Sequence, residues 1–221
     1  MTIELRNITK VYRSRRGGKK TVLTDVNATF ERGYSYGLLG LNGAGKSTLL
    51  RLICGAERPT FGDVLSDVSI SWRLGFTAGF NSTLTGMENL RFVCRIYGAD
   101  IAEVSDFVED FAEIGNAIHE PVRNYSSGMR ARLAFGLSMA IRFQVYVIDE
   151  SLAVGDVTFQ EKCQMEFDRR REESDILITS HSPTMIQQYC DRAGVIEAGK
   201  LTMFDNLDDA TDFYEQVISA R

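Results

Sequence analysis

The chain has 221 residues, of which 44% are hydrophobic and 25% are charged, and its formal net charge at pH 7 is -5. This composition is that of an ordinary globular protein and excludes a disordered or fibrous chain, while the acidic balance argues against a nucleic-acid partner. No run approaches the ~18 apolar residues that a membrane-spanning helix needs, so we expect a cytoplasmic protein. The four cysteines form no CxxC pair, which favours reduced thiols over a disulfide or zinc site.

The N-terminal part of the chain predicts a hairpin that is followed by a strand, a loop and a helix. Apolar and polar side chains alternate in Ile3–Val11 and again in Val22–Phe30, as in two strands that each bury one face. A short apolar stretch, Ser35–Leu39, then runs through glycines into a helical pattern at Ser47–Cys54. A loop between a strand and a helix is therefore expected at about residues 40–46.

The middle of the chain predicts a helical insertion. Helical periodicity occurs in Met87–Tyr97 and in Ile101–Gly115, with acidic residues gathered on one face. We expect the insertion to cover about residues 76–128, between core segments 1–75 and 129–221.

The C-terminal half predicts helices that alternate with apolar strands. The helical segments are Met129–Ile141 and Phe159–Arg171, and the apolar strands are Val145–Ile148 and Ile176–Thr179. Such alternation implies a largely parallel sheet that is covered on both faces. The expected fold class is therefore α/β, in a single domain of residues 1–221 with a mostly parallel sheet, an N-terminal antiparallel β element and an inserted α-helical subdomain.

The loop between the third predicted strand and the first predicted helix carries a nucleotide-binding motif. Residues 40–47 fit the pattern GxxxxGK[ST], whose glycines let successive backbone N–H groups point at phosphate oxygens. Lys46 would reach the β- and γ-phosphates of ATP, and the Ser47 hydroxyl is a hard oxygen ligand for Mg²⁺. The residues that we assign to nucleotide binding here are Gly40, Leu41, Asn42, Gly43, Ala44, Gly45, Lys46, Ser47 and Thr48.

Polar side chains that follow two of the apolar strands complete a candidate catalytic set. Asp149 and Glu150 end the strand Val145–Ile148, at the sheet edge where open α/β sheets bind ligands. Paired acids are also common in solvated turns, but the motif upstream favours Asp149 as a magnesium ligand through water and Glu150 as the general base. His181 would hydrogen-bond the γ-phosphate, and Glu150, His181 and Lys46 are the expected catalytic residues.

A further motif lies in residues 124–129, Asn-Tyr-Ser-Ser-Gly-Met. It resembles the Leu-Ser-Gly-Gly-Gln signature of the ATP-binding cassette (ABC) transporter family, with Ser126 and Gly128 matching and three positions substituted. The nucleotide-binding loop, the Asp-Glu pair and the histidine also occur in the order and spacing of that family. This resemblance covers nearly the whole chain, and it implies a P-loop NTPase (RecA-like) core.

The resemblance also implies an assembly. Members of the family form a head-to-tail homodimer in which ATP lies between the P-loop of one subunit and the signature residues of the other, here Ser126, Ser127 and Gly128. It further implies that Asp156 lies at the dimer interface and that Tyr12 stacks on adenine. The partner would be a multi-spanning membrane permease, with this subunit bound peripherally at the cytoplasmic face of the inner membrane.

The segments SWRLGFTAGFNSTLTGMEN, YSSGM and DESLAVGDVTFQEKC resemble the ATPase subunits of capsular polysaccharide exporters. This implies an ATPase that drives export of a capsular polysaccharide. In one departure, residues 71–76 lack the glutamine that the family usually carries before the helical insertion, and Arg73 lies there without an assigned role.

Other interpretations stay open. The nearest are the ATPases of O-antigen and teichoic-acid exporters; many O-antigen ATPases carry a carbohydrate-recognition domain that this sequence does not contain. A soluble, non-transport ABC ATPase, a P-loop kinase and a catalytically inactive regulatory subunit are more distant alternatives.

Overall fold

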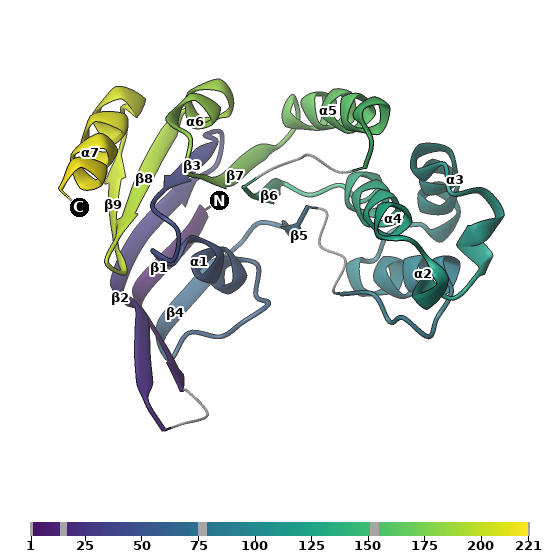
Figure 1. Cartoon of the computed structure of the whole chain (residues 1–221), viewed down its shortest axis with the longest axis horizontal. Coiled ribbons are helices and arrows are strands. Elements are labelled where there is room, and N and C mark those ends of the chain that lie inside the picture. The colour runs from purple at the N-terminus through teal and green to yellow at the C-terminus, as the bar shows by residue number, and fades with distance from the viewer. Residues whose placement is uncertain (1, 14–16, 75–78, 151–154, 221) are drawn as a thin grey trace. The chain divides into compact units, whose positions relative to one another are not determined.

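The computed structural model describes residues 2–13, 17–74, 79–150 and 155–220. The chain divides into two compact units, one made from residues 1–73, 144–151 and 174–221, and the other from residues 74–143 and 152–173. Figure 1 labels the helices and strands of both units. None of the helices in the described ranges combines the length and the apolar character that crossing a membrane requires.

The first unit contains two β-sheets. Within the described residues, the smaller sheet has the strand order β2-β1-β4 and is antiparallel, and the larger has the order β5-β6-β7-β3-β8-β9. The larger sheet is parallel from β5 to β8, and β9 runs antiparallel to β8 at its edge. The strands are β1 (Thr2–Arg13), β2 (Lys19–Glu31), β3 (Tyr36–Leu39), β4 (Phe61–Ser66), β5 (Ile70–Arg73), β6 (Val145–Asp149), β7 (Asp175–Ser180), β8 (Arg192–Glu197) and β9 (Lys200–Phe204).

These sheets confirm the predicted α/β class, including the mostly parallel sheet and the N-terminal antiparallel element. The hairpin pairs Ile3 with Phe30 across β1 and β2. In the parallel sheet, Leu39 pairs with Ser180 and Asp149 pairs with Thr179. Because neighbouring parallel strands end at the same edge of a sheet, the carboxyl ends of β3, β6 and β7 lie together at one edge.

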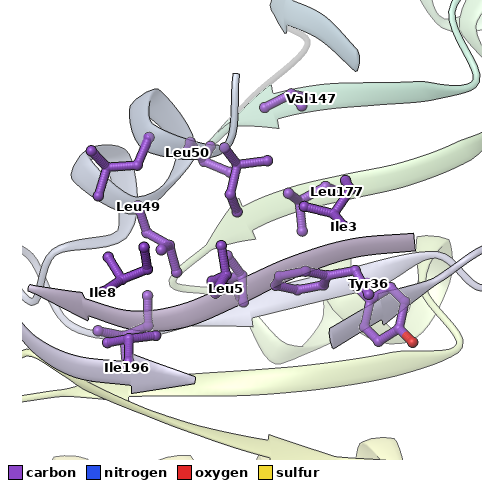
Figure 2. Close-up of a cluster of buried hydrophobic side chains, with 14 of the residues drawn as sticks. Ile3, Leu5, Ile8, Tyr36, Leu49, Leu50, Val147, Leu177 and Ile196 are labelled. Atoms are coloured by element: carbon purple, nitrogen blue, oxygen red, sulfur yellow. The ribbon is translucent and has the colours of Figure 1, made fainter. Parts of the chain in front are cut away.

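Helices cover the first unit, and its core lies between the sheets and the first helix. The helices are α1 (Lys46–Ile53), α6 (Pro183–Tyr189) and α7 (Leu207–Ser219). Figure 2 shows side chains from β1, β3, α1, β6, β7 and β8 gathered in one buried cluster. Strand β6 is buried from Val145 to Ile148, as expected of a parallel strand with elements on both faces. The apolar runs in the sequence therefore become the interior of this unit.

The second unit is helical. Its elements are α2 (Gly86–Tyr97), α3 (Ile101–Ala112), the 3-10 turns η2 (Gly115–His119) and η3 (Val122–Asn124), α4 (Ser127–Ala140) and α5 (Val157–Arg171). Phe111 of α3 is central, because its ring stacks on Phe135 of α4 at 6.0 Å and meets Phe159 of α5 edge-on at 5.5 Å between centroids. Aromatic contacts thus join three helices that are far apart in the sequence.

The extent of the second unit differs from the insertion expected at residues 76–128. Helices α4 and α5 were assigned to the core at 129–221, whereas the structure places both in the second unit. The reason is the aromatic cluster around Phe111, which joins α4 and α5 to α3. Residues 75–78, at the expected start of the insertion, lie outside the described residues.

Several predicted helix ends were wrong by a few residues because of capping. Helices α4 and α5 each begin two residues before the expected start, since Ser126 and Asp156 accept backbone hydrogen bonds at their N-termini. Helix α3 ends at Ala112 rather than at Gly115, because Glu113 adopts a left-handed conformation with φ of 53°.

Candidate functional site

The P-loop joins β3 to α1 in the predicted arrangement of strand, loop and helix. Gly45, the N-cap of α1, has φ of 119°, a conformation that side chains rarely adopt. A Cβ atom at this position would also lie only 2.9 Å from Cδ2 of Leu23. Because Gly45 offers no capping side chain, the first turn of α1 is suited to receive an anion through its N–H groups.

Lys46 is a buried cation in this loop. Its side chain is 4% exposed, and Nζ donates to the carbonyl oxygens of Gly40 at 2.6 Å and Leu41 at 3.3 Å. Burial lowers the pKa of Lys46, and the carboxylates of Glu150 and Asp149 oppose that shift. Nζ lies 3.9 Å from the Glu150 carboxylate. A buried ammonium group needs nearby negative charge, and a phosphate group would supply it.

Asp149 accepts hydrogen bonds from three elements. Its Oδ1 atom accepts from the hydroxyls of Ser47, at 3.1 Å, and Thr179, at 2.7 Å. Its Oδ2 atom accepts from Nη1 of Arg73 at 2.7 Å. The structure therefore brings together the two predicted magnesium ligands, Ser47 and Asp149, and adds Thr179 and Arg73, which sequence reasoning had not assigned.

This arrangement fits a magnesium ion. Ser47 and Asp149 present hard oxygens side by side, and the described ranges contain no group of three or more His, Cys, Asp or Glu residues that could hold a metal by themselves. Mg²⁺ commonly takes one or two protein ligands and completes its octahedron with phosphate oxygens and water. The donor set thus suits a metal that arrives with a nucleotide.

Glu150 follows β6 in an unusual backbone conformation. Its φ is 69°, and its N–H donates to the carbonyl oxygen of Thr179 at 3.0 Å. Non-glycine residues seldom adopt positive φ, and such conformations cluster at functional sites. The Glu150 side chain is 48% exposed and lines the same pocket as Lys46. His181 is exposed and follows β7 at the same sheet edge, but it is not among the described residues that line the pocket.

The pocket has a volume of about 430 Å³. The described residues that line it are Tyr12, Lys20, Val22, Asn42, Gly43, Gly45, Lys46, Ser47, Thr48 and Glu150. The structure thus joins most of the predicted P-loop residues to the predicted aromatic, Tyr12, and the predicted base, Glu150. Lys20 and Val22 of β2 had not been predicted as pocket residues, because they are far from the P-loop in the sequence and only the folded structure brings them near it.

A hydrogen-bond network holds Tyr12. Its hydroxyl donates to Glu57 at 2.7 Å and accepts from Nη2 of Arg51 at 3.0 Å. Arg51 also donates to the hydroxyl of Thr48 at 3.0 Å, so the network links β1 to helix α1. Lys10 Nζ lies 5.1 Å from the centre of the Tyr12 ring and 3.3 Å from Glu57. The sequence analysis did not predict this network because its residues do not form a motif with a regular spacing along the chain.

The signature residues lie in the second unit, at the start of α4. The Ser126 hydroxyl accepts from the N–H of Met129 at 3.1 Å, and Ser126 and Ser127 are exposed. A Cβ atom on Gly128 would meet only Ser126 Oγ, at 3.8 Å. The N-terminus of α4 therefore presents small residues and a hydroxyl at the surface of this unit.

Asp156 has a local role in the second unit. It caps α5 by accepting from the N–H of Phe159 at 3.1 Å, and it pairs with Arg132 at 2.6 Å. The hydrogen bond from Phe159 and the bond from Arg132 lower the pKa of Asp156. Residues 151–154, which precede it in the motif that suggested a dimer-interface role, lie outside the described residues.

Comparison with known proteins agrees with this geometry. The family model described as ABC transporter matches residues 23–153. The capsule polysaccharide export ATP-binding protein CtrD of Neisseria meningitidis serogroup B is 48% identical to this chain, over 97% of this chain and 99% of that protein. The polysialic acid transport ATP-binding protein KpsT of Escherichia coli is 44% identical, over 97% of this chain and 99% of that protein.

A solved structure supports the fold. The ATP-binding cassette MJ0796, in a dimeric post-hydrolysis state bound to ADP and phosphate, superposes with a TM-score of 0.71 at 19% identity, covering 90% of this chain and 96% of that one. That likeness concerns the fold. The family model and the relatives, which match over nearly the full chain, show that this chain belongs to the ABC transporter family, as one of its ATP-binding subunits.

Proposed function

We propose that this chain is the ATP-hydrolysing subunit of an exporter that moves a capsular polysaccharide across the inner membrane. The observation that carries the ATPase part is that Lys46, Ser47 and Glu150 line one pocket, while Asp149 accepts a hydrogen bond from Ser47. The polysaccharide part rests on the names of CtrD and KpsT, which match this chain over nearly their full length.

The residues divide the work of phosphoryl transfer to water. Lys46 and the N–H groups at the start of α1 bind the β- and γ-phosphates. Ser47 and Asp149 would hold Mg²⁺, which when bound would supply positive charge against the charge that develops on the phosphates. Glu150 accepts a proton from the attacking water, whose oxygen forms a bond to the γ-phosphorus. The bond from that phosphorus to the β–γ bridging oxygen breaks at the same time, and ADP leaves with the bridging oxygen while inorganic phosphate is formed. His181 donates a hydrogen bond to the γ-phosphate, and Tyr12 stacks on the adenine.

The assembly that we propose is a head-to-tail homodimer under a multi-spanning permease. The N-terminus of α4, with Ser126, Ser127 and Gly128, suits a phosphate that a second copy of the chain brings. ATP would close the dimer because it binds the closed state better than the open one. The motion would then pass to the permease, which holds this subunit at the cytoplasmic face of the inner membrane.

A biochemical test separates nucleotide binding from hydrolysis. Glu150→Gln removes the base but keeps the shape, so we expect ATP hydrolysis to fall by about 100-fold or more while ATP still binds. Lys46→Ala should lose most of its affinity for ATP. Glu215→Gln, which changes an exposed carboxylate on α7, is the matched control and should leave both properties intact. Hydrolysis at the normal rate by Glu150→Gln would show that Glu150 is not the base.

A cellular test addresses the exported polymer. The gene is deleted and complemented with wild type or with Glu150→Gln, and surface and intracellular polysaccharide are measured separately. We expect polymer to accumulate inside the cell in the deletion and in the variant. Normal surface polysaccharide in the deletion would refute the export function and leave the ATPase assignment standing.

A further inference from the structure

We propose that Arg73 is a positioning residue for the magnesium site: it holds Asp149 by one carboxylate oxygen so that the other stays directed at Ser47. The inference rests on the proposed function, since it assumes that Ser47 and Asp149 hold Mg²⁺ with the nucleotide. Neither the motifs nor the comparisons assign a role to this arginine.

The two oxygens of Asp149 face different partners. Oδ1 accepts from Ser47 of α1 at 3.1 Å and from Thr179 of β7 at 2.7 Å. Oδ2 accepts a hydrogen bond from Nη1 of Arg73 at 2.7 Å, which is also an ion pair. The arginine therefore engages the carboxylate without using the oxygen that lies beside Ser47.

The backbone around Arg73 is fixed to the strand that carries Asp149. Strand β5 lies beside β6, with Arg73 paired to Val147. Ser71, which is fully buried, accepts a hydrogen bond from the N–H of Val147 at 2.9 Å. The side chains of Arg73 and Asp149 are only 22% and 16% exposed. The pair is thus partly shielded from water and anchored on two neighbouring strands.

An aspartate does not fix its own carboxylate orientation, because rotation about its last side-chain bond is broad. A hydrogen bond to Oδ2 restricts that rotation, and the guanidinium of an arginine keeps its charge at all ordinary pH values. Residues that hydrogen-bond metal ligands in this way commonly change metal affinity by about 10- to 100-fold when they are replaced. The positive charge of Arg73 would also repel a cation, and the Mg²⁺ titration described below measures whether orientation of Asp149 outweighs that repulsion.

The simpler alternative is a structural ion pair that only stabilises the sheet edge. The two roles differ in one measurable quantity, the Mg²⁺ concentration at which nucleotide binding is half-enhanced. A structural pair would affect the melting temperature and leave that midpoint unchanged. A positioning residue would move the midpoint and leave metal-free binding of ATP intact.

The experiment compares wild type, Arg73→Met and Arg73→Lys. Affinity for ATP is measured in EDTA, and affinity for a slowly hydrolysed ATP analogue is measured across a Mg²⁺ titration, with thermal melting alongside. Arg192→Met is the matched control, since Arg192 lies on β8 at similar exposure, 24%, and pairs with Glu31 at 2.9 Å.

We expect Arg73→Met to raise the Mg²⁺ midpoint by about 10-fold and to change ATP affinity in EDTA by less than about 2-fold. Arg73→Lys keeps the charge but not the planar fork, so we expect a smaller rise, about 3-fold. Arg192→Met should lower the melting temperature without moving the midpoint. The lysine variant also preserves the test if the methionine variant does not fold.

Three results would overturn the proposal. An unchanged midpoint in both Arg73 variants would make Arg73 a structural partner only. A lower midpoint would make it a competitor of the metal. If nucleotide binding by wild type did not depend on Mg²⁺ at all, the proposed metal site would fail together with this inference, which distinguishes that result from the first two.

Discussion

Removal of the Tyr12 hydroxyl tests whether the network around this ring orients it for a nucleotide base. In Tyr12→Phe the ring remains, but the bonds to Glu57, at 2.7 Å, and from Arg51, at 3.0 Å, are lost. Hydrogen bonds to charged groups contribute about 1.5 to 3 kcal/mol. Because Glu57 is 27% exposed, we expect the free energy of unfolding to fall by the lower part of that range, about 1.5 to 2 kcal/mol.

The same change should weaken ATP binding but not phosphate binding. A ring that is no longer held must be ordered when the base stacks on it, so we expect ATP affinity to fall by about 3- to 10-fold. Inorganic tripolyphosphate has no base, and its affinity should change by less than about 2-fold. Titration of both ligands into Tyr12→Phe, Glu57→Gln and the double variant measures the effect, and the two single changes should not add.

The hydrogen bonds to Glu57 also predict that the free energy of unfolding depends on pH. Burial raises the pKa of Glu57, but the hydrogen bonds from Tyr12, Arg51 and Lys10 outweigh burial and bring its net pKa below the ordinary value of 4.5. The folded protein therefore favours the charged form. This contribution is present above the unfolded pKa and is lost as the pH falls through the lower folded pKa. Glu57→Gln should not show that acid-dependent loss in urea unfolding curves.

A control variant and one contrary result complete this test. Tyr34→Phe removes the hydroxyl of another, 40% exposed tyrosine and should leave ATP affinity unchanged. If Tyr12→Phe and Glu57→Gln both bind ATP as tightly as wild type, the network does not orient Tyr12 for nucleotide binding, and our reasoning about this ring is wrong.

Two substitutions and one labelling experiment test the packing within each of the two units. Leu50→Ala should lower the free energy of unfolding by about 2 to 5 kcal/mol, measured by urea unfolding, because Leu50 is fully buried in the core of the first unit. Thr85→Ala should cost about 1 kcal/mol in the same assay, since Thr85 and Glu88 form a capping box at the start of α2. Burial raises the pKa of Cys54 and of Cys163 to about 12, so both thiols should react slowly with a maleimide at pH 8 and quickly after unfolding; rapid labelling of the native protein would contradict this.

Local patterns in the sequence were sufficient for the elements that the chain forms within short distances. Alternation in Ile3–Val11 and Val22–Phe30 predicted the hairpin, and the apolar run before Asp149 predicted a buried parallel strand. The P-loop could be predicted because glycine, lysine and serine at fixed spacing describe one continuous turn. In each case the physical determinant lies within about a dozen neighbouring residues.

Capping and packing explain most of the differences. The starts of α4 and α5 depended on whether Ser126 and Asp156 accept backbone hydrogen bonds, which their residue types permit but do not require. The placement of these helices in the second unit depended on Phe111, which contacts aromatic rings from two distant segments. Such contacts depend on how the helices pack, so no regular spacing of residues along the chain predicts them.

The sequence by itself determined that this protein has a P-loop, the adjacent acids Asp149 and Glu150, and a signature-like motif at residues 124–129, because each motif consists of adjacent residues. Only the tertiary structure decided how Asp149 is held, since Arg73 and Thr179 lie 76 and 30 residues away from it along the chain. These residues lie next to Asp149 in space because β5, β6 and β7 are neighbours in one parallel sheet and end at the same edge. Strand order, which depends on the packing of the whole unit, therefore sets the surroundings of the residue that we assign to the metal.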